Sequence, residues 1–249
     1  MSAVSIYPVA GLPEIVKGAP LPELVMEGLD RLEMSLEAGD VVVITQKVVS
    51  KAEGRVVRLG QVHPSARATE IGQRIGFDPR HVEVILSESV RVVREAPRVL
   101  ITETRHGFIC ANGGVDRSNT GGKEMVILLP EHPDESASRL RASFQKLSRV
   151  SVGVVISDSF GRPWREGQVN VAIGSAGVVA LRDYRGRQDP DGYELQGTEL
   201  AVVDELASAA ELVMGKLDRV PVALIRGAMV AGDDRVQTLL RDPATDLFR

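Results

Sequence analysis

Hydrophobic residues in the first 45 positions follow two different spacings. Residues 4–9 and 41–44 are short apolar runs, and the second is the continuous Val-Val-Val-Ile that is typical of a strand covered on both faces. Between them, Leu and Val recur at three- and four-residue steps over residues 21–36, which predicts an amphipathic helix, and Gly39 suits a left-handed cap that ends it. The chain is therefore expected to begin with a strand, a helix and a second strand.

The rest of the chain mixes helical and extended patterns. Residues 65–95 are mostly helical in pattern, whereas residues 150–156 form a buried apolar strand that ends directly before Ser-Asp-Ser. Thr198 is suited to cap a late helix, and residues 220–225 are expected to form the last strand. Because strands and helices mix without strict alternation, we expect an α+β fold with a mixed sheet rather than a doubly wound sheet.

The sequence contains no internal repeat and no long linker of biased composition. Its 249 residues, 43% of them hydrophobic, are enough for one large core or two modest ones. We expect a single domain over residues 1–249, and two interleaved lobes are the alternative.

Composition narrows the class of protein. Thirty basic and 34 acidic residues give a net charge of −4, which disfavours general nucleic-acid binding. The one cysteine, Cys110, excludes a disulfide framework and a multi-cysteine metal site, and the four histidines lack ligand spacing. There is no signal-like leader and no apolar run of 18 residues, so a cytoplasmic protein without a membrane span is expected.

Candidate chemistry lies in polar residues beside the buried strands. No P-loop, no Gly-x-Gly-x-x-Gly fingerprint and no Gly-x-Ser-x-Gly elbow is present, so neither a P-loop nor a Rossmann site is expected. Oxygen donors suit Mg²⁺ or Mn²⁺ with nucleotide phosphates, and lysines suit the phosphates themselves. The residues concerned are Lys47, Lys51, Asp116, Asn119, Asp158, Ser159 and Gln196.

Each of these residues also has an ordinary structural role. An Asp after a strand or in a glycine-rich turn most often caps that turn, and lysines most often lie in solvent. Arg162, Trp164 and Arg165 form either a surface ion-pair cluster or a stacking surface for an aromatic ligand. Pattern alone therefore goes no further than a metal–nucleotide enzyme as one alternative.

Five sequence blocks, in this order, carry a resemblance. They are Gly11-Leu12-Pro13, Val49-Ser50-Lys51-Ala52-Glu53-Gly54, Gly113-Gly114-Val115-Asp116-x-Ser118-Asn119, Ser157-Asp158-Ser159-x-Gly161-Arg162 and Val203-Asp204-Glu205-Leu206-Ala207. The chain resembles the coenzyme F-420-0:L-glutamate ligase (F-420 gamma-glutamyl ligase) family in its stand-alone form, over essentially its whole length. An ordered set of separate blocks is far more specific than any one of them.

The resemblance implies a fold, an activity and partners. It implies a mixed-sheet α+β fold peculiar to the family, a cytoplasmic homodimer, and GTP-dependent, GDP-forming ligation of L-glutamate to F-420-0 through an acyl phosphate. Further gamma-linked glutamates can follow. It also implies two divalent cations, Mn²⁺ or Mg²⁺, and a stimulating K⁺. The alternatives are a ligase for a variant deazaflavin or another carboxylated phosphodiester, and a non-catalytic nucleotide-binding protein of the same fold.

The family's functional residues carry over position by position. Asp116 and Asp158 match ligands of one metal, Ser159 and Gln196 match ligands of the second, and Asp116, Asp158 and Lys51 are the expected catalytic residues. Gln196 stands where some members carry glutamate, which keeps an oxygen donor but removes a charge. The resemblance implies nucleotide contacts at Leu12, Pro13, Glu14, Ile15, Gln46, Lys47, Lys51, Asn119, Glu194, Leu195, Gln196, Gly197, Thr198, Glu199, Leu200 and Ala201. The base for amine attack is open between solvent and a loop carboxylate such as Glu166.

Overall fold

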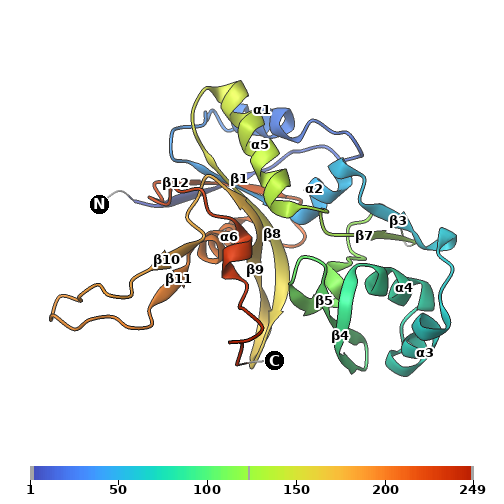
Figure 1. The fold of residues 1–249 in the computed structure, drawn as a ribbon. Helices are drawn as coiled ribbons and strands as arrows, with labels where there is room; N and C mark the ends of the chain where they lie inside the picture. Colours follow the sequence, from blue (N-terminus) through green and yellow to red (C-terminus); the bar gives the residue numbers. More distant parts are fainter. Residues whose placement is uncertain (1–2, 123, 248–249) are drawn as a thin grey trace.

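The computed structural model describes residues 3–122 and 124–247, and its centre is a five-stranded mixed sheet (Figure 1). The strand order is β1(Ser5–Val9), β12(Val222–Arg226), β2(Val41–Thr45), β8(Gly153–Arg162) and β9(Arg165–Ala176). β2 and β8 pair in parallel, and the other neighbours pair antiparallel. This mixed sheet confirms the expected α+β class.

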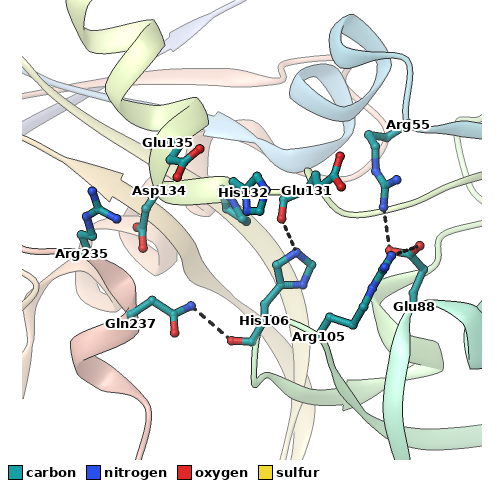
Figure 2. Close-up of a pocket in the computed structure, with 11 residues that line it drawn as sticks. Arg55, Glu88, Arg105, His106, Glu131, His132, Asp134, Glu135, Arg235 and Gln237 are labelled. Atoms are coloured by element: carbon teal, nitrogen blue, oxygen red, sulfur yellow. Dashed lines mark hydrogen bonds and ion pairs between the residues drawn. The ribbon is translucent and has the colours of Figure 1, made fainter.

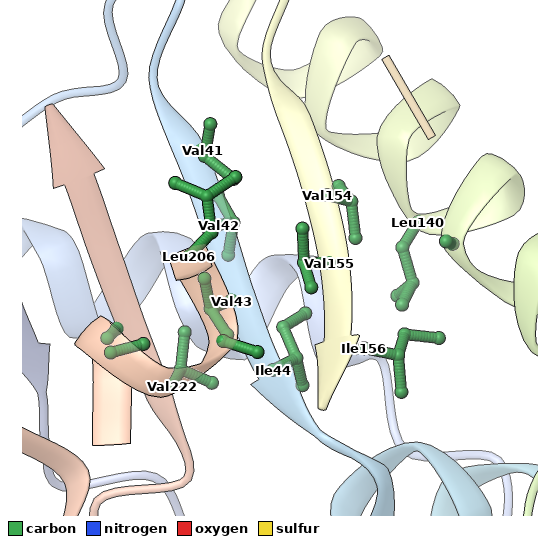
Figure 3. Packing of buried hydrophobic residues seen from close by; sticks show 14 of the residues in the cluster. Val41, Val42, Val43, Ile44, Leu140, Val154, Val155, Ile156, Leu206 and Val222 are labelled. Atoms are coloured by element: carbon green, nitrogen blue, oxygen red, sulfur yellow. The ribbon is translucent and has the colours of Figure 1, made fainter. Parts of the chain in front are cut away.

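Four helices flank the sheet: α1(Leu21–Asp30), α2(Gln46–Glu53), α5(Pro133–Ser148) and α6(Val202–Met214). In Figure 1, α1, α2 and α5 lie on the upper side of the sheet and α6 on the lower side. The apolar runs of β2 and β8 are buried because both faces are covered, and Figure 3 shows Val41–Ile44 and Val154–Ile156 between Leu140 and Leu206. Burying such apolar surface is the main stabilising term of the fold.

A second hydrophobic cluster lies beside the first, at the lower right of Figure 1. Leu59, Ile71, Val82, Leu100 and Val126 are among its fully or almost fully buried members. Its elements are β3(Val56–Arg58), the short 3₁₀ turn η1(Leu59–Gln61), α3(Ala66–Ile75), α4(Pro79–Ser87), β4(Ser89–Ala96), β5(Val99–Thr104), β6(Ile109–Ala111), the 3₁₀ turn η2(Asn112–Gly114) and β7(Met125–Ile127). β3 pairs with β7, and β4, β5 and β6 form an antiparallel sheet.

A two-stranded hairpin projects from the body at the lower left of Figure 1. Its base pairs β10(Leu181–Asp183) with β11(Glu199–Ala201), and backbone hydrogen bonds from Tyr184 N to Thr198 O (2.9 Å) and from Gly186 N to Leu195 O (2.8 Å) extend the pairing. The last described element is the 3₁₀ turn η3(Val236–Leu239). No helix of residues 3–122 and 124–247 is long and apolar enough to cross a membrane.

Several element boundaries differ from those that the pattern predicts. The first helix ends at Asp30 rather than near residue 36, because Glu33 adopts a left-handed φ of 56° that turns the chain. Residues 89–96 form β4 rather than helix, since they pair with β5. Thr198 is not a helix cap: α6 begins at Val202, and the segment before it is strand β11.

The most consequential difference concerns β8. It begins at Gly153 and continues to Arg162, so Asp158 and Ser159 lie inside a strand instead of in a loop after it. Asp158 pairs with Val171 of β9, and Ser159 pairs with Asn170. A long partner strand thus holds the two polar residues in a fixed extended backbone.

Candidate nucleotide and metal site

Polar residues gather at one edge of the central sheet, where β2 ends and β12 begins. β2 and β8 run parallel with Thr45 opposite Ser157, so the first turn of α2 and the outer half of β8 leave the core together. β12 runs antiparallel to β2, and Thr45 N donates a hydrogen bond to Pro221 O at 2.9 Å. The connection between α6 and β12 therefore reaches the same edge, which is where ligands of layered α/β structures are commonly held.

Asp116 comes to this edge from the glycine-rich segment. Two backbone hydrogen bonds with Ile127, of 2.8 and 2.9 Å, fix its position. Lys47 Nζ lies 2.6 Å from Asp116 Oδ2 and 2.7 Å from Ser118 Oγ. Ser118 N and Ser118 Oγ both donate to Asp116 Oδ1, at 3.0 and 2.9 Å. The Asp116 carboxylate is thus oriented by an ammonium group and two neutral donors.

The two aspartates have opposite electrostatic surroundings. Burial raises the pKa of Asp158 to about 7, and the charge of Asp116 adds to this effect while Lys47 and Lys216 oppose it. Burial also acts to raise the pKa of Asp116, but Lys47 and Ser118 outweigh it, and this pKa lies below its ordinary value. A divalent cation at these carboxylates would keep both of them ionised, because it compensates the charge that burial disfavours.

Two buried polar atoms at the same place lack hydrogen bonds. Gln46 Nε2 and Ser157 Oγ have no hydrogen-bond partner among the described residues. Both side chains border a cavity of about 100 Å³ that Asp158 and Ser159 also line. Gln46 Oε1 accepts from Ser50 Oγ at 3.0 Å, which holds the amide in place. Because buried polar groups are nearly always hydrogen-bonded in native proteins, these atoms are available to a polar ligand.

The donors at this edge fit a metal that is shared with phosphate. Within residues 3–122 and 124–247, no group of three or more His, Cys, Asp or Glu side chains is arranged to hold a metal ion by itself. Asp116 and Asp158 supply two carboxylates, and a Mg²⁺ or Mn²⁺ ion commonly completes such a shell with substrate phosphates and water. The residues present therefore fit one divalent ion bound together with a phosphorylated ligand.

A larger cavity of about 570 Å³ shares Lys47 and Asn119 with the 100 Å³ cavity that Asp158 lines. Its volume falls in the range of small-molecule and cofactor pockets. Lys51 Nζ, at its wall, lies 2.5 Å from Glu14 Oε1. Residues from four separate parts of the chain line the cavity, and among them are Leu12, Pro13, Glu14, Ile15, Lys47, Lys51 and Asn119. These seven are positions at which the resemblance implies nucleotide contacts.

Comparison with known proteins identifies the family. The model of the F420-0:gamma-glutamyl ligase family matches residues 11–227. The coenzyme F420:L-glutamate ligase of Methanocaldococcus jannaschii is 43% identical over 94% of this chain and 96% of its own length. The enzymes of the same name from Methanopyrus kandleri (46% identity, 96% and 99% coverage) and Halobacterium salinarum (44%, 98% and 94%) are similar over the same extent. The chain belongs to the F420-0:gamma-glutamyl ligase family. This membership confirms the resemblance carried by the five sequence blocks.

In this family member, one predicted segment lies away from the edge that holds Asp116 and Asp158. Residues 194–201 form the returning strand of the hairpin, and Gln196 is exposed there. None of the residues 184–201 lines either of the two cavities at this edge. Helix α6, 13 residues or about 20 Å long, separates the hairpin from the connection that reaches the site. Within one chain, Gln196 is thus not brought together with Asp116, Asp158 and Ser159.

Two basic residues at this edge of the sheet are absent from the set that the sequence suggests. Lys216 and Arg219, in the connection between α6 and β12, line both the 100 Å³ and the 570 Å³ cavities. Gly215-Lys216 is not part of a P-loop, because Ala210 stands at the required glycine position and Leu217 follows the lysine. The sequence feature that could have identified Lys216 is its position, directly after the glycine that ends a helix and shortly before a buried strand.

Other polar candidates lie outside these cavities. Glu166 is exposed on β9 and is not among the described lining residues, and its role as a base stays a prediction. Arg162 Nη2 donates to Glu166 O at 2.5 Å, which closes the β8–β9 turn. Trp164, in that turn, is 80% exposed and has a left-handed φ of 56°. The Arg162 side chain thus stabilises the turn at the far end of the long β8–β9 hairpin.

A second polar cavity, of about 370 Å³, lies between the two hydrophobic clusters (Figure 2). At one side of it, Glu88 pairs with both Arg55 and Arg105 at 2.7 Å. Asp134 at its wall accepts hydrogen bonds from Ser175 N (2.8 Å) and Val236 N (3.1 Å). The carboxylates of Glu88 and Asp134 thus already have partners within the protein.

Proposed function

We propose that the chain is a ligase of coenzyme F420 biosynthesis that joins L-glutamate to F420-0 with GTP as the energy source, forming GDP and phosphate. The names of its relatives support the substrate and the bond formed. The observation that carries the use of a nucleotide is the 570 Å³ cavity, where Leu12, Lys51 and Asn119 meet beside the Asp116–Asp158 pair. Further gamma-linked glutamates are a repetition of the same chemistry.

The reaction has two balanced steps. A carboxylate oxygen of F420-0 attacks the γ-phosphorus of GTP, the bond to the β–γ bridging oxygen breaks, and GDP leaves. The amine nitrogen of glutamate then attacks the acyl phosphate carbon, inorganic phosphate leaves, and the amine proton passes to solvent or a nearby carboxylate. Phosphoryl transfer of this kind depends mainly on positioning and charge neutralisation.

The site's own side chains suit that task. Lys51 and Lys47 border the nucleotide cavity and present ammonium groups to a polyphosphate. Asp116 and Asp158 would hold a divalent cation, Mn²⁺ or Mg²⁺, and the bound cation would neutralise phosphate charge. The unpartnered Gln46 Nε2 would donate to a phosphate or carboxylate oxygen.

We further propose a cytoplasmic homodimer that K⁺ stimulates. The projecting hairpin supports self-association, because Tyr193, directly after the turn at residues 189–192, is 65% exposed. A second copy is also the source from which residues 194–201 could reach a nucleotide site, since α6 keeps them away from the site of their own chain. Light scattering at micromolar concentration tests this state, and a monomeric mass contradicts it.

One assay separates the proposed ligase from its alternatives. The purified chain is incubated with F420-0, L-glutamate, GTP and Mn²⁺, and products are identified by mass spectrometry. We expect the glutamyl amide of F420-0 with equimolar GDP, and no product after chelation with EDTA. Product only from a variant deazaflavin or another carboxylated phosphodiester selects the alternative ligase. Nucleotide binding without any product selects the non-catalytic binding protein.

A matched pair of variants ties the activity to the site. Asp158→Asn removes one proposed ligand charge and is expected to abolish product formation. Asp30→Asn makes the same chemical change at an exposed residue at the end of α1 and is expected to leave activity unchanged. Equal activity of the two variants contradicts the assignment of Asp158.

A further inference from the structure

Lys216 lies between the cavities of the site. It follows Gly215, the residue that ends α6, and its side chain borders the 100 Å³ cavity, the 570 Å³ cavity and a third cavity of about 250 Å³ near Asp116. Among the other basic residues that the structure describes, only Lys47 also lines all three of these cavities. An ammonium group there faces both the nucleotide space and the aspartate pair.

The Lys216 ammonium contacts the residue expected to bind the second metal. Lys216 Nζ donates a hydrogen bond to Ser159 Oγ. Ser159 Oγ in turn donates its own hydrogen to Asn170 Oδ1 at 2.7 Å. A hydroxyl has one hydrogen and two lone pairs, so the ammonium occupies one of the two lone pairs through which Ser159 could bind a metal. Nζ also counters the charge of Asp158, whose pKa it acts to lower.

The second expected ligand does not reach this place in the chain. Gln196 is exposed on the projecting hairpin, at the other end of α6 from Lys216. A dication at Ser159 would also lie within a few ångströms of the Lys216 ammonium, and like charges at that separation repel. The donors that one chain supplies at Ser159 therefore do not fit a second divalent ion, although Asp116 and Asp158 fit one.

We propose that the Lys216 ammonium replaces the second divalent cation, so that each chain binds one Mn²⁺ or Mg²⁺ ion and Lys216 supplies the other positive charge to the phosphates. This inference rests on the proposed function, because it assigns the charges of that same site. Lys216 would contact non-bridging phosphate oxygens of a nucleoside triphosphate. Because this charge is part of the chain, it does not have to bind from solution as a metal ion does. Its pairing with Ser159 positions it before the nucleotide arrives.

The number of bound metal ions tests the proposal without relying on turnover. The protein is equilibrated with Mn²⁺ and saturating GDP by dialysis, and the bound manganese is quantified by atomic absorption. We expect one Mn²⁺ per wild-type chain and an uncoupled Mn²⁺ electron-paramagnetic-resonance spectrum. Lys216→Gln removes the charge and offers an amide oxygen, so it is expected to bind two Mn²⁺ ions per chain, with spin coupling between them. Lys216→Arg keeps the charge and is expected to stay at one.

Lys146→Gln, at an exposed position near the end of α5, is the matched control and is expected to bind one ion. At limiting Mn²⁺, Lys216→Gln should lower kcat about a hundredfold relative to wild type. At high Mn²⁺, the kcat of this variant should rise at least about tenfold. Two Mn²⁺ ions on the wild-type chain, the result expected if Gln196 of a second copy completed a metal site at Ser159, overturn the proposal and leave the proposed function standing. No bound Mn²⁺ instead refutes the metal dependence of the function. Lys216→Gln with one ion and unchanged kinetics also overturns the proposal, and the wild-type measurement decides the case if that variant fails to fold.

Discussion

Replacing Asp158 with asparagine should stabilise the metal-free protein while it destroys activity. The substitution keeps the shape of the side chain and one of its oxygens, and it removes the charge. Asp158 lies within strand β8, and burial raises its pKa to about 7, with Asp116 adding to the effect and Lys47 and Lys216 opposing it. A carboxylate in these surroundings is costly to ionise unless a cation is bound.

The size of the effect can be worked out from that pKa. The ordinary pKa of an Asp is about 3.9, and one pKa unit corresponds to about 1.4 kcal/mol. Full ionisation of Asp158 at a pKa of about 7 therefore costs the folded metal-free state at most about 4 kcal/mol. Asparagine should recover part of this, about 1–3 kcal/mol. In a chain of this size, 1 kcal/mol shifts the melting temperature by about 2–4 °C, so a gain of several degrees is expected.

The sign of the pH dependence is fixed by the direction of the pKa change. Because the folded-state pKa is raised, the favourable contribution of protonated Asp158 is complete below about pH 4 and is lost as pH rises through about 7. The wild-type protein should thus lose stability relative to Asp158→Asn between pH 5 and pH 8. Thermal unfolding in EDTA at both pH values, followed by circular dichroism, measures the difference, and Asp30→Asn is the control that should show none.

Activity should move in the opposite direction. Loss of about 3 kcal/mol of transition-state stabilisation lowers the rate more than a hundredfold. Two results refute the reasoning: a stability difference that is the same at pH 5 and pH 8, or near-normal turnover by Asp158→Asn at saturating Mn²⁺. A variant that melts well below wild type shows instead that Asp158 supports the fold, and it refutes the assignment of a functional charge.

Three further changes have defined outcomes. Lys51→Met should raise KM for GTP about tenfold or more with a smaller effect on KM for glutamate, because a charged hydrogen bond to phosphate is lost; steady-state kinetics show this, and equal changes in both KM values contradict it. Gly174→Ala places a Cβ about 2.5 Å from the Pro133 carbonyl, so urea unfolding should show a loss of about 1–3 kcal/mol, and an unchanged midpoint opposes the close packing of α5 on β9. Glu88→Gln leaves Arg55 and Arg105 without their carboxylate and should cost about 2 kcal/mol, less than for a fully buried pair because both arginines reach solvent, while KM for GTP stays constant; a changed KM would give that cavity a functional role.

The sequence predicts the strands whose buried residues form an uninterrupted apolar run. Residues 41–44 and the first half of β8 are uninterrupted apolar runs, and the structure confirms both as central strands. The end of β8 could not be predicted in this way, because Ser157, Asp158 and Ser159 have no strand pattern of their own. Pairing with β9 holds them extended. This pairing forms because the turn at 163–164 brings β9 back alongside β8. Tertiary context similarly makes residues 89–96 a strand, against a pattern that continues a helix.

The composition of the site depends on strand direction, which a single sequence does not reveal. The apolar pattern of residues 220–225 indicates a strand but is the same for a parallel and an antiparallel neighbour. Because β12 runs antiparallel to β2, its first residue lies beside the end of β2, and the preceding Lys216 arrives at the edge that holds Asp158. Had β12 run parallel, the same lysine would lie at the opposite edge of the sheet. Helix α6 then separates the hairpin on its N-terminal side from the connection on its C-terminal side by about 20 Å, which moves Gln196 away from Asp158 and brings Lys216 toward it. The position of the Lys216 ammonium beside Asp158 is thus set by the direction of one strand.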